Sequence, residues 1–180
     1  MGRRSAAAGF TIIELMVVVA IAGVLSLAAL PAMRDMITSN RMKAVSLDLY
    51  TSLALARSEA IKRSASNVSM VAASGGWQNG WTVCVDGATT PPTPNGSCGD
   101  AQDIVLITGD APDSSLTLTG PAGNIVTYNR DGRLATTAPA FKIKAGTNNA
   151  KAPMRCVDVS ASGRPATRAD SNGVDSDGCN

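Results

Sequence analysis

Residues 9–31 read GFTIIELMVVVAIAGVLSLAALP, and this stretch decides how the rest of the chain is organised. Residues 10–33 form a run of 24 residues in which Glu14 is the only charge. As an α-helix rising about 1.5 Å per residue, the run would be about 36 Å long, enough to cross the hydrocarbon core of a bilayer. The sequence therefore predicts a helical membrane anchor over residues 10–33.

Three interpretations compete for this anchor: a cleaved secretory signal, a plain anchor, and an anchor with a second use. A secretory signal has a shorter apolar region that ends at a small-residue cleavage site, whereas this run continues through Pro31 into further helical sequence. A plain anchor does not account for Glu14, because a charged residue inside a spanning helix costs about 2.5–3.5 kcal/mol at mid-membrane and less toward the end. Glu14 is therefore a candidate functional residue that needs a partner.

The run Gly9-Phe10-Thr11-Ile12-Ile13-Glu14-Leu15, which follows a short basic head, resembles the processing site of type IV prepilins and type II secretion pseudopilins. The resemblance implies that a prepilin peptidase cleaves between Gly9 and Phe10 and methylates the new amine of Phe10. It also implies that Glu14 serves in assembly, together with Pro31, the helix-breaking proline near the end of the apolar run.

Elementary electrostatics gives Glu14 the same role. After cleavage the amine of Phe10 is a cation at the start of a helix, and Glu14 is an anion one turn further on. In a stack of staggered helices, Glu14 of one subunit can pair with the amine of its neighbour, because a buried charge is tolerated only with a partner. This pairing would set the axial register of assembly. Pro31 is predicted to bend or loosen the helix, since proline lacks an N–H and clashes one turn back.

Length and cysteine usage indicate where the remainder of the chain lies. The 180 residues suffice for one anchor and one modest globular domain. All four cysteines follow the anchor, which indicates an oxidising compartment. Arg3 and Arg4 precede it and place the N-terminus in the cytoplasm by the positive-inside rule. The predicted location is the inner membrane, with a single pass and a periplasmic C-terminal domain, and later the extracellular pilus.

The composition argues against catalysis. The chain contains no histidine, which excludes His-based triads, histidine metal sites and histidine pH switches. No phosphate-binding glycine loop or catalytic carboxylate pair is evident. Residues 170–178 faintly resemble a calcium loop but lack its closing glutamate and its spacing. We therefore predict no enzyme activity, no catalytic residue, no metal site and no cofactor.

The helix is predicted to continue beyond the anchor to residue 65. Apolar residues spaced three or four apart predict one stripe that packs against the chain's own sheet. The stripe consists of Met42, Val45, Leu49, Leu53, Ala56 and Ala60.

From about residue 66 the apolar period changes to two, which is typical of strands. Strands are predicted at residues 68–73, 77–85, 104–107, 115–119, 125–128, 141–144 and 155–159. Gly75-Gly76 and residues 129–132 are predicted turns. Trp77 and Trp81 are interpreted as core residues. A helix followed by short antiparallel strands is an α+β arrangement.

Segments of the strand region extend the resemblance to the FimT/FimU/GspH group of minor pilins and pseudopilins, namely residues 80–83, 128–133 and 157–164. The resemblance implies the α+β type IV pilin-like fold, with a long N-terminal helix, membrane-spanning in its first half, packed on a C-terminal antiparallel β-sheet domain. The predicted domains are a leader peptide (1–9), a pilin helix (10–65, with 10–33 as the transmembrane or filament core) and a β-rich head (66–180).

Four cysteines allow three disulfide pairings. The pairing local in sequence joins Cys84 to Cys98 across a proline-rich loop, and Cys156 to Cys179 across the C-terminal segment. We predict this pairing, and the spacings do not resemble a zinc site.

Charge is distributed unevenly in the head. Residues 66–129 contain five aspartates and no lysine or arginine, whereas residues 130–168 contain eight lysines and arginines against two aspartates. One interpretation is a solvated sheet face that fits neighbouring subunits. The other is a groove for the backbone of double-stranded DNA, with candidate residues Arg133, Lys142, Lys144, Arg164 and Arg168.

The DNA interpretation draws on a resemblance as well. Some FimT-type minor pilins capture DNA through an arginine-bearing motif that begins Gly-Arg, as Gly163-Arg164 does here. The next arginine, Arg168, comes four residues on instead of two, and an acidic tail follows it. Both departures separate this chain from the DNA-binding pattern.

We interpret the chain as a minor pilin of a type IV pilus, a structural subunit that is incorporated into the filament or primes its tip. Its expected partners are other major and minor pilins, prepilin peptidase as the processing enzyme, and the inner membrane. Two alternatives stay open: a DNA-binding minor pilin for uptake in natural transformation, and a minor pseudopilin of a type II secretion system.

Overall fold

A computed structural model of the chain describes residues 9–63, 68–87, 98–99, 101–146, 152–171 and 179, without the side chains of residues 28–32. Most of the predicted leader, residues 1–8, lies outside this described part. So do most of the proline-rich loop between Cys84 and Cys98 and most of the calcium-like segment of residues 170–178.

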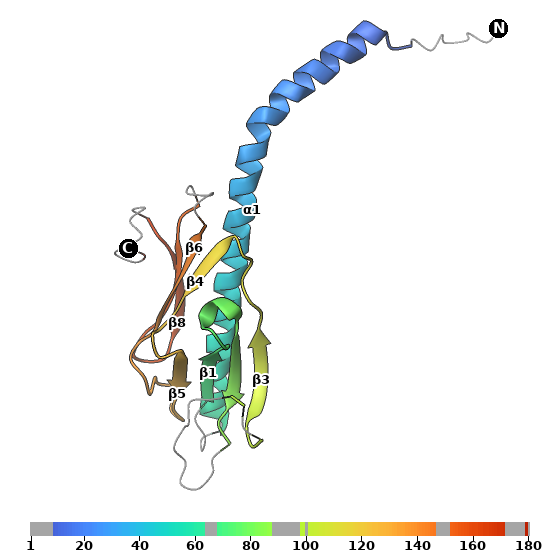
Figure 1. Ribbon diagram of the computed structural model, residues 1–180. Coiled ribbons are helices and arrows are strands. Elements are labelled where there is room, and N and C mark those ends of the chain that lie inside the picture. The colour runs from blue at the N-terminus through green and yellow to red at the C-terminus, as the bar shows by residue number, and fades with distance from the viewer. Residues whose placement is uncertain are drawn as a thin grey trace, which may run out of the picture.

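One long helix, α1 (Ile12–Arg63), dominates the molecule. Its C-terminal half packs against the strands and its N-terminal half projects away from them, curving as it leaves the domain (Figure 1). The helix continues through Pro31 without interruption. Pro31, which was predicted to bend or loosen the helix, therefore lies inside one continuous helix.

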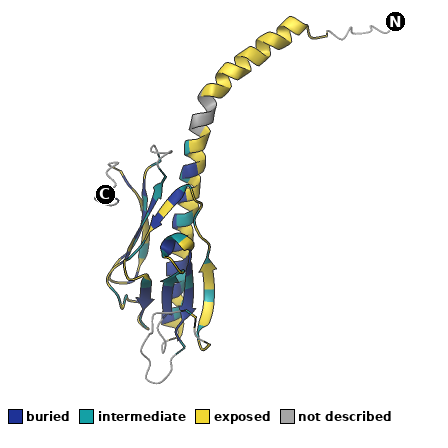
Figure 2. Cartoon of the chain, in the orientation of Figure 1, coloured by how far each residue is buried: buried dark blue, intermediate teal, exposed yellow. Residues whose placement is uncertain are grey.

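The predicted apolar stripe of α1 is confirmed. Met42, Leu49, Leu53, Ala56 and Ala60 are fully buried, and Val45 packs against the same core while partly exposed. Figure 2 shows the resulting contrast along α1, which is buried where it meets the strands and exposed where it projects. The stripe has the helical period expected of one face laid on a sheet.

Within the described ranges, eight strands form two four-stranded antiparallel sheets. One sheet has the order β3-β2-β1-β5 and the other the order β4-β6-β7-β8. Their bounds are β1 (Val68–Ala72), β2 (Trp81–Val85), β3 (Ile104–Gly109), β4 (Leu116–Thr119), β5 (Ile125–Tyr128), β6 (Ala140–Ala145), β7 (Arg155–Val159) and β8 (Pro165–Ala169). The α+β class is confirmed, and α1 packs against strands of both sheets.

The predicted strand over residues 77–85 is wrong in its first half. Trp77–Asn79 forms a short 3-10 helix, η1, and β2 begins only at Trp81, after Gly80 with φ +100°. Trp77 nevertheless lies in the core, with its ring edge-on to Phe141 at a centroid distance of 4.8 Å. Trp81 is buried as well, and its indole N–H donates to the Ser52 hydroxyl of α1 at 3.0 Å. The assignment of both tryptophans to the core is confirmed.

Strand β8 has no counterpart in the sequence prediction. Its residues, Pro-Ala-Thr-Arg-Ala, begin with a proline and contain no large apolar side chain. The strand forms because it pairs with all five residues of β7, from Arg155↔Ala169 to Val159↔Pro165. Its position depends on its neighbour and not on its own hydrophobic pattern.

Both predicted disulfides are present. Cys84–Cys98 and Cys156–Cys179 have Cα–Cα distances of 5.6 and 5.9 Å. The second packs on Met154 in a small cluster apart from the main core, and so fastens the C-terminal end of the chain to β7.

Removing the second disulfide should destabilise the head markedly. In a Cys156→Ser/Cys179→Ser variant we expect the free energy of unfolding to fall by about 3 kcal/mol, because the open chain gains conformational entropy in the unfolded state. Urea unfolding of the full chain in detergent measures this loss. A reductant should then weaken the variant further, since Cys84–Cys98 remains; an unchanged urea midpoint in the variant would show that the bridge contributes nothing.

Candidate functional site

The projecting half of α1 is apolar on all sides. Large side chains here expose between 52 % and 82 % of their surface: Ile12, Ile13, Leu15, Met16, Val17, Val18, Val19, Ile21, Val24, Leu25 and Leu27. Such an all-round apolar helix is typical of one that is buried among other helices or in lipid. In the part of the chain that the structure describes, no helix has the length and apolar character of a membrane span.

The start of α1 is capped by Thr11. Gly9 and Phe10 precede the helix in exposed, non-helical backbone. The backbone N–H of Glu14 donates to the Thr11 hydroxyl at 3.2 Å, which satisfies one of the free donors at a helix start. Glu14 itself is exposed in the first turn, where the helix dipole favours a carboxylate.

Sequence reasoning missed Thr11. Thr11-Ile12-Ile13-Glu14 has the spacing of a capping box, in which a Thr hydroxyl caps the backbone N–H of a Glu three residues later. That pattern could have revealed the residue, and it gives Glu14 a local structural position besides any role between subunits.

Two turns of the head touch one another beneath the C-terminal end of α1. The predicted turn at residues 129–132 is confirmed: the Gly132 N–H donates to the Asn129 carbonyl at 2.8 Å, with Gly132 at φ +70°. The second turn links β7 to β8 and holds Gly163 at φ +79°. A Cβ on Gly163 would lie 2.0 Å from the Gly132 carbonyl oxygen, so the close contact requires glycine.

Arg57 connects these turns to the helix. Its Nε donates to the Gly132 carbonyl oxygen at 3.1 Å. Tyr128, at the start of the first turn, is fully buried, and burial raises the pKa of its phenol despite the opposing charge of Arg57. Two of the segments that carry the family resemblance, residues 128–133 and 157–164, therefore meet at one point.

The structure divides the five candidate DNA-binding residues between two places. Arg133 and Arg164 each follow one of the touching glycines and are exposed. Lys142 and Lys144 lie on β6, where Lys142 is paired with Cys156 of β7 and so shares the sheet face that bears the second disulfide. Arg168 lies on this face too, with its guanidinium in an ion pair with Asp158.

A cleft separates α1 from the start of β8, and we call it the α1/β8 cleft. It has a volume of about 320 Å³ and is lined by Tyr50, Arg57, Ser58, Ile61, Arg164 and Pro165, with Ala54. Its two charged residues, Arg57 and Arg164, are both cations. Arg57 is half-buried and Arg164 is exposed.

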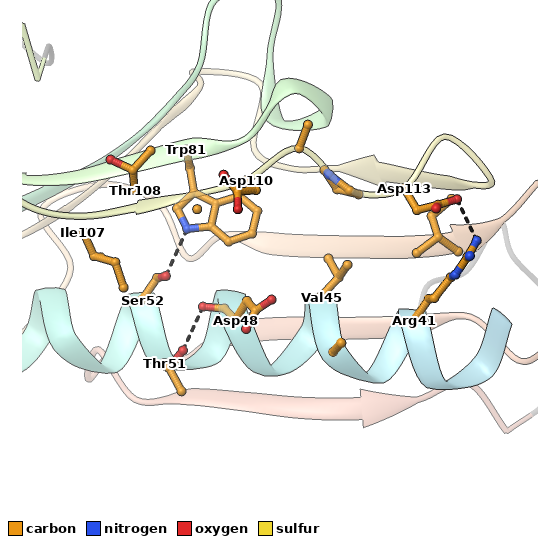
Figure 3. Close-up of a pocket in the computed structure, with 15 residues that line it drawn as sticks. Arg41, Val45, Asp48, Thr51, Ser52, Trp81, Ile107, Thr108, Asp110 and Asp113 are labelled. Atoms are coloured by element: carbon orange, nitrogen blue, oxygen red, sulfur yellow. Dashed lines mark hydrogen bonds and ion pairs between the residues drawn. The ribbon is translucent and has the colours of Figure 1, made fainter. Parts of the chain in front are cut away.

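A second cleft, the α1/β3 cleft, lies between α1 and the segment from β3 to β4 (Figure 3). Its volume is about 390 Å³. Arg41 and Asp113 form an ion pair at its rim, 2.9 Å between Nη1 and Oδ1. Hydrogen bonds from Ser115, with a smaller contribution from Arg41, hold the pKa of Asp113 below its ordinary value.

The other two charges in the α1/β3 cleft are both acidic. Asp48 projects from α1, and Asp110 comes from the chain that follows β3 on the opposite wall (Figure 3). Within the described residues neither carboxylate takes part in an ion pair or a side-chain hydrogen bond.

Comparison with known proteins agrees with this geometry. The family described as Type II transport protein GspH matches residues 46–163, and the prokaryotic N-terminal methylation motif matches residues 4–30. No curated protein matched the sequence.

Two solved structures share the fold. The type IV minor pilin FimU of Pseudomonas aeruginosa is 20 % identical with a TM-score of 0.54, over 75 % of this chain and 96 % of that one. The minor pseudopilin EpsH of the Vibrio cholerae type 2 secretion system is 16 % identical with a TM-score of 0.51, over 72 % and 97 % of the two chains. With a fold shared by minor pilins and pseudopilins, a methylation motif and a family match over most of its head, the chain belongs to the GspH family.

Proposed function

We propose that the protein is a minor pilin of a type IV pilus. The apolar helix that projects from the head carries this proposal, since its side chains are exposed on every side and the methylation motif, matched over residues 4–30, includes the start of this helix. Residues 10–33 would lodge in the inner membrane first and later bundle with the same helices of other pilins. Each environment removes the same apolar surface from water. The protein would be an assembly subunit and not a catalyst.

Processing would create the charge that Glu14 requires. Cleavage between Gly9 and Phe10 by prepilin peptidase leaves an amine on Phe10, methylated but still cationic, just before the Thr11 cap. Glu14 of one subunit would pair with this amine of a neighbour, because a carboxylate inside a bundle of apolar helices is stable only with a counter-charge. The exposure of Glu14 supports this role, since its carboxylate is free to meet another chain.

Two substitutions distinguish the effect of the Glu14 charge on assembly from the effect of the Thr11 helix cap. Glu14→Gln keeps a residue that a capping box accepts but removes the charge, so we expect incorporation into sheared filaments to fall at least roughly tenfold, as loss of a buried ion pair would produce. Thr11→Ala removes the cap hydroxyl and keeps the charge, and should cost only about 1 kcal/mol of helix stability. Immunoblots of sheared filaments and of membranes give the ratio of incorporated to membrane-bound protein for each variant. Equal incorporation of Glu14→Gln and wild type would refute the pairing.

Because the fold is also similar to that of EpsH, a minor pseudopilin, the alternative assembly is the pseudopilus of a type II secretion system. Crosslinking in cells, followed by identification of the attached proteins, distinguishes the two systems. Attachment to pilus subunits supports the proposal, and attachment only to secretion components would replace it with the pseudopilin function.

DNA uptake is a further candidate function, favoured by the arginines around the touching turns. Arg57 and Arg164 line one cleft and Arg133 adjoins it through the Gly132–Gly163 contact. Because Asp158 already occupies the guanidinium of Arg168, Arg164→Ala should weaken DNA binding more than Arg168→Ala. A gel shift of the full chain with double-stranded DNA at two salt concentrations tests this, since phosphate contacts weaken steeply with salt. Equal binding by wild type and an Arg164→Ala/Arg168→Ala variant would rule the function out.

A further inference from the structure

Parallel assembly restricts which faces of neighbouring heads can meet. This inference rests on the proposed function, in which all helices enter the bundle from the same membrane and therefore run parallel. Neighbours related by rotation about a common axis then meet with one flank of α1 against the opposite flank of the next subunit. Such contacts are heterologous, so the two flanks have to complement one another and not themselves.

The flanks of α1 carry opposite charge in this chain. Figure 1 shows β3 on one side of α1 and β8 on the other. On the β3 flank the α1/β3 cleft contains Asp48 and Asp110, whose carboxylates have no ion pair with any residue that the structure describes. On the β8 flank the described residues that line the α1/β8 cleft include Arg57 and Arg164 and no acidic side chain.

The open edge of β3 extends the acidic cleft with apolar surface. Strand β3 is at the end of its sheet, and Ile104, Val105 and Ile107 are 50 %, 54 % and 39 % exposed. The strand contains no proline and no charge, although natural edge strands are usually protected by one or the other. An exposed apolar edge strand of this kind is a surface on which another chain can pair.

The edge of β8 is built differently. It begins with Pro165, which cannot donate a backbone hydrogen bond, and its only charged side chain, Arg168, pairs with Asp158. Arg164, just before the strand, is exposed, and its side chain has no ion pair or hydrogen bond among the described residues. Arg164 is therefore a cation on this flank that is free to reach another molecule.

We propose that the β3 flank of one subunit binds the β8 flank of a second copy of this chain, with Arg164 of the second copy placed between Asp48 and Asp110. Charge complementarity selects the partner flank, and the exposed apolar residues of β3 supply buried area. Arg57 lies nine residues after Asp48 on α1, which is about 14 Å along the helix. When the two clefts face one another, the second copy is therefore shifted relative to the first along the shared helix direction. The shift is roughly this distance, toward the N-terminal end of α1.

Cysteine crosslinking between differently tagged full-length chains in membranes and in filaments tests the contact. Thr108→Cys marks the α1/β3 cleft and Ser58→Cys marks the α1/β8 cleft. Because the native cysteines of the described residues are in disulfides, the introduced thiols provide the new crosslink. We expect a heterodimer of the Thr108→Cys and Ser58→Cys chains, and little homodimer of either one.

Charge reversal provides the matched control. Asp110→Arg on the first chain, or Arg164→Glu on the second, should each reduce the heterodimer roughly fivefold or more. Combining the two reversed chains restores opposite charges and should recover most of it. Recovery by the double reversal would support the contact, whereas insensitivity to both single reversals would overturn it.

The outcomes distinguish this contact from the proposed function. Filaments that contain the chain without the Thr108–Ser58 crosslink would overturn the contact and leave the pilin function intact. Absence of the chain from filaments would count against the pilin function, and the crosslink in membranes would still decide the contact. Homodimers of Thr108→Cys as abundant as the heterodimer would overturn it too, because they indicate a flank that meets itself.

Discussion

Gly163→Ala is expected to lower the free energy of unfolding of the head by roughly 4 kcal/mol, a loss at the severe end for a single substitution. The backbone at Gly163 has φ +79°, where any residue with a Cβ is strained. The added methyl would also lie 2.0 Å from the Gly132 carbonyl oxygen and 3.1 Å from the ring of Tyr128. Since that carbonyl is held by Arg57 of α1, the turns cannot separate without disturbing the helix.

Urea unfolding of the full chain in detergent, followed by tryptophan fluorescence, measures this loss. The chain has two tryptophans, and both Trp77 and Trp81 are buried in the head, so their fluorescence reports its unfolding. Gly123→Ala is the matched control, because its Cβ would meet only Ile125, at 3.8 Å, and its cost should stay within about 0.5 kcal/mol. Similar costs for the two variants would show that the two turns are not in close contact.

Leu53→Ala is expected to cost about 3 kcal/mol, and Leu47→Ala almost nothing. Leu53 is fully buried in the core, whereas Leu47, six residues earlier on the same helix, is 58 % exposed. Truncating the buried leucine loses transfer free energy and leaves a cavity; truncating the exposed one does neither, and alanine is the better helix former. The same urea experiment compares them.

The Leu47 variant also separates folding from assembly. Its unfolding should match wild type, and any loss of filament incorporation would then reflect the outer face of α1. A large loss of stability in Leu47→Ala, or none in Leu53→Ala, would contradict the packing of α1 on the head.

Patterns along the chain were sufficient for the features that depend on local sequence. The stripe from Met42 to Ala60, the turn at residues 129–132 and the disulfide partners follow from helical period, turn chemistry and proximity in sequence. Strand β8 does not follow from its sequence, because its small and polar residues show no strand pattern and its position comes from pairing with β7. The division of the strands into two sheets likewise depends on long-range pairing, which no short window contains.

The same distinction holds for the candidate site: contiguous motifs could be recognised in the sequence, and groupings of distant residues could not. Gly9, Phe10 and Glu14 lie in the contiguous stretch that the methylation motif matches, residues 4–30, and their roles in processing and assembly stay predictions. The grouping of Arg164 with Arg57 could not be predicted from the sequence, because 107 positions separate them and a contact between two glycine turns brings them together. The pairing of Arg168 with Asp158 depends on the hairpin of β7 and β8, and hence on the strand that the pattern missed.

We propose that processing at Gly9 converts the projecting apolar helix from a membrane anchor into the part of the chain that joins the filament. Mass spectrometry of the N-terminal peptide of this chain, recovered from sheared filaments, tests it most directly. We expect a peptide that begins at Phe10 and carries one methyl group on its amine. A filament-borne peptide that still begins at Met1, or one that begins within residues 11–33, would contradict it.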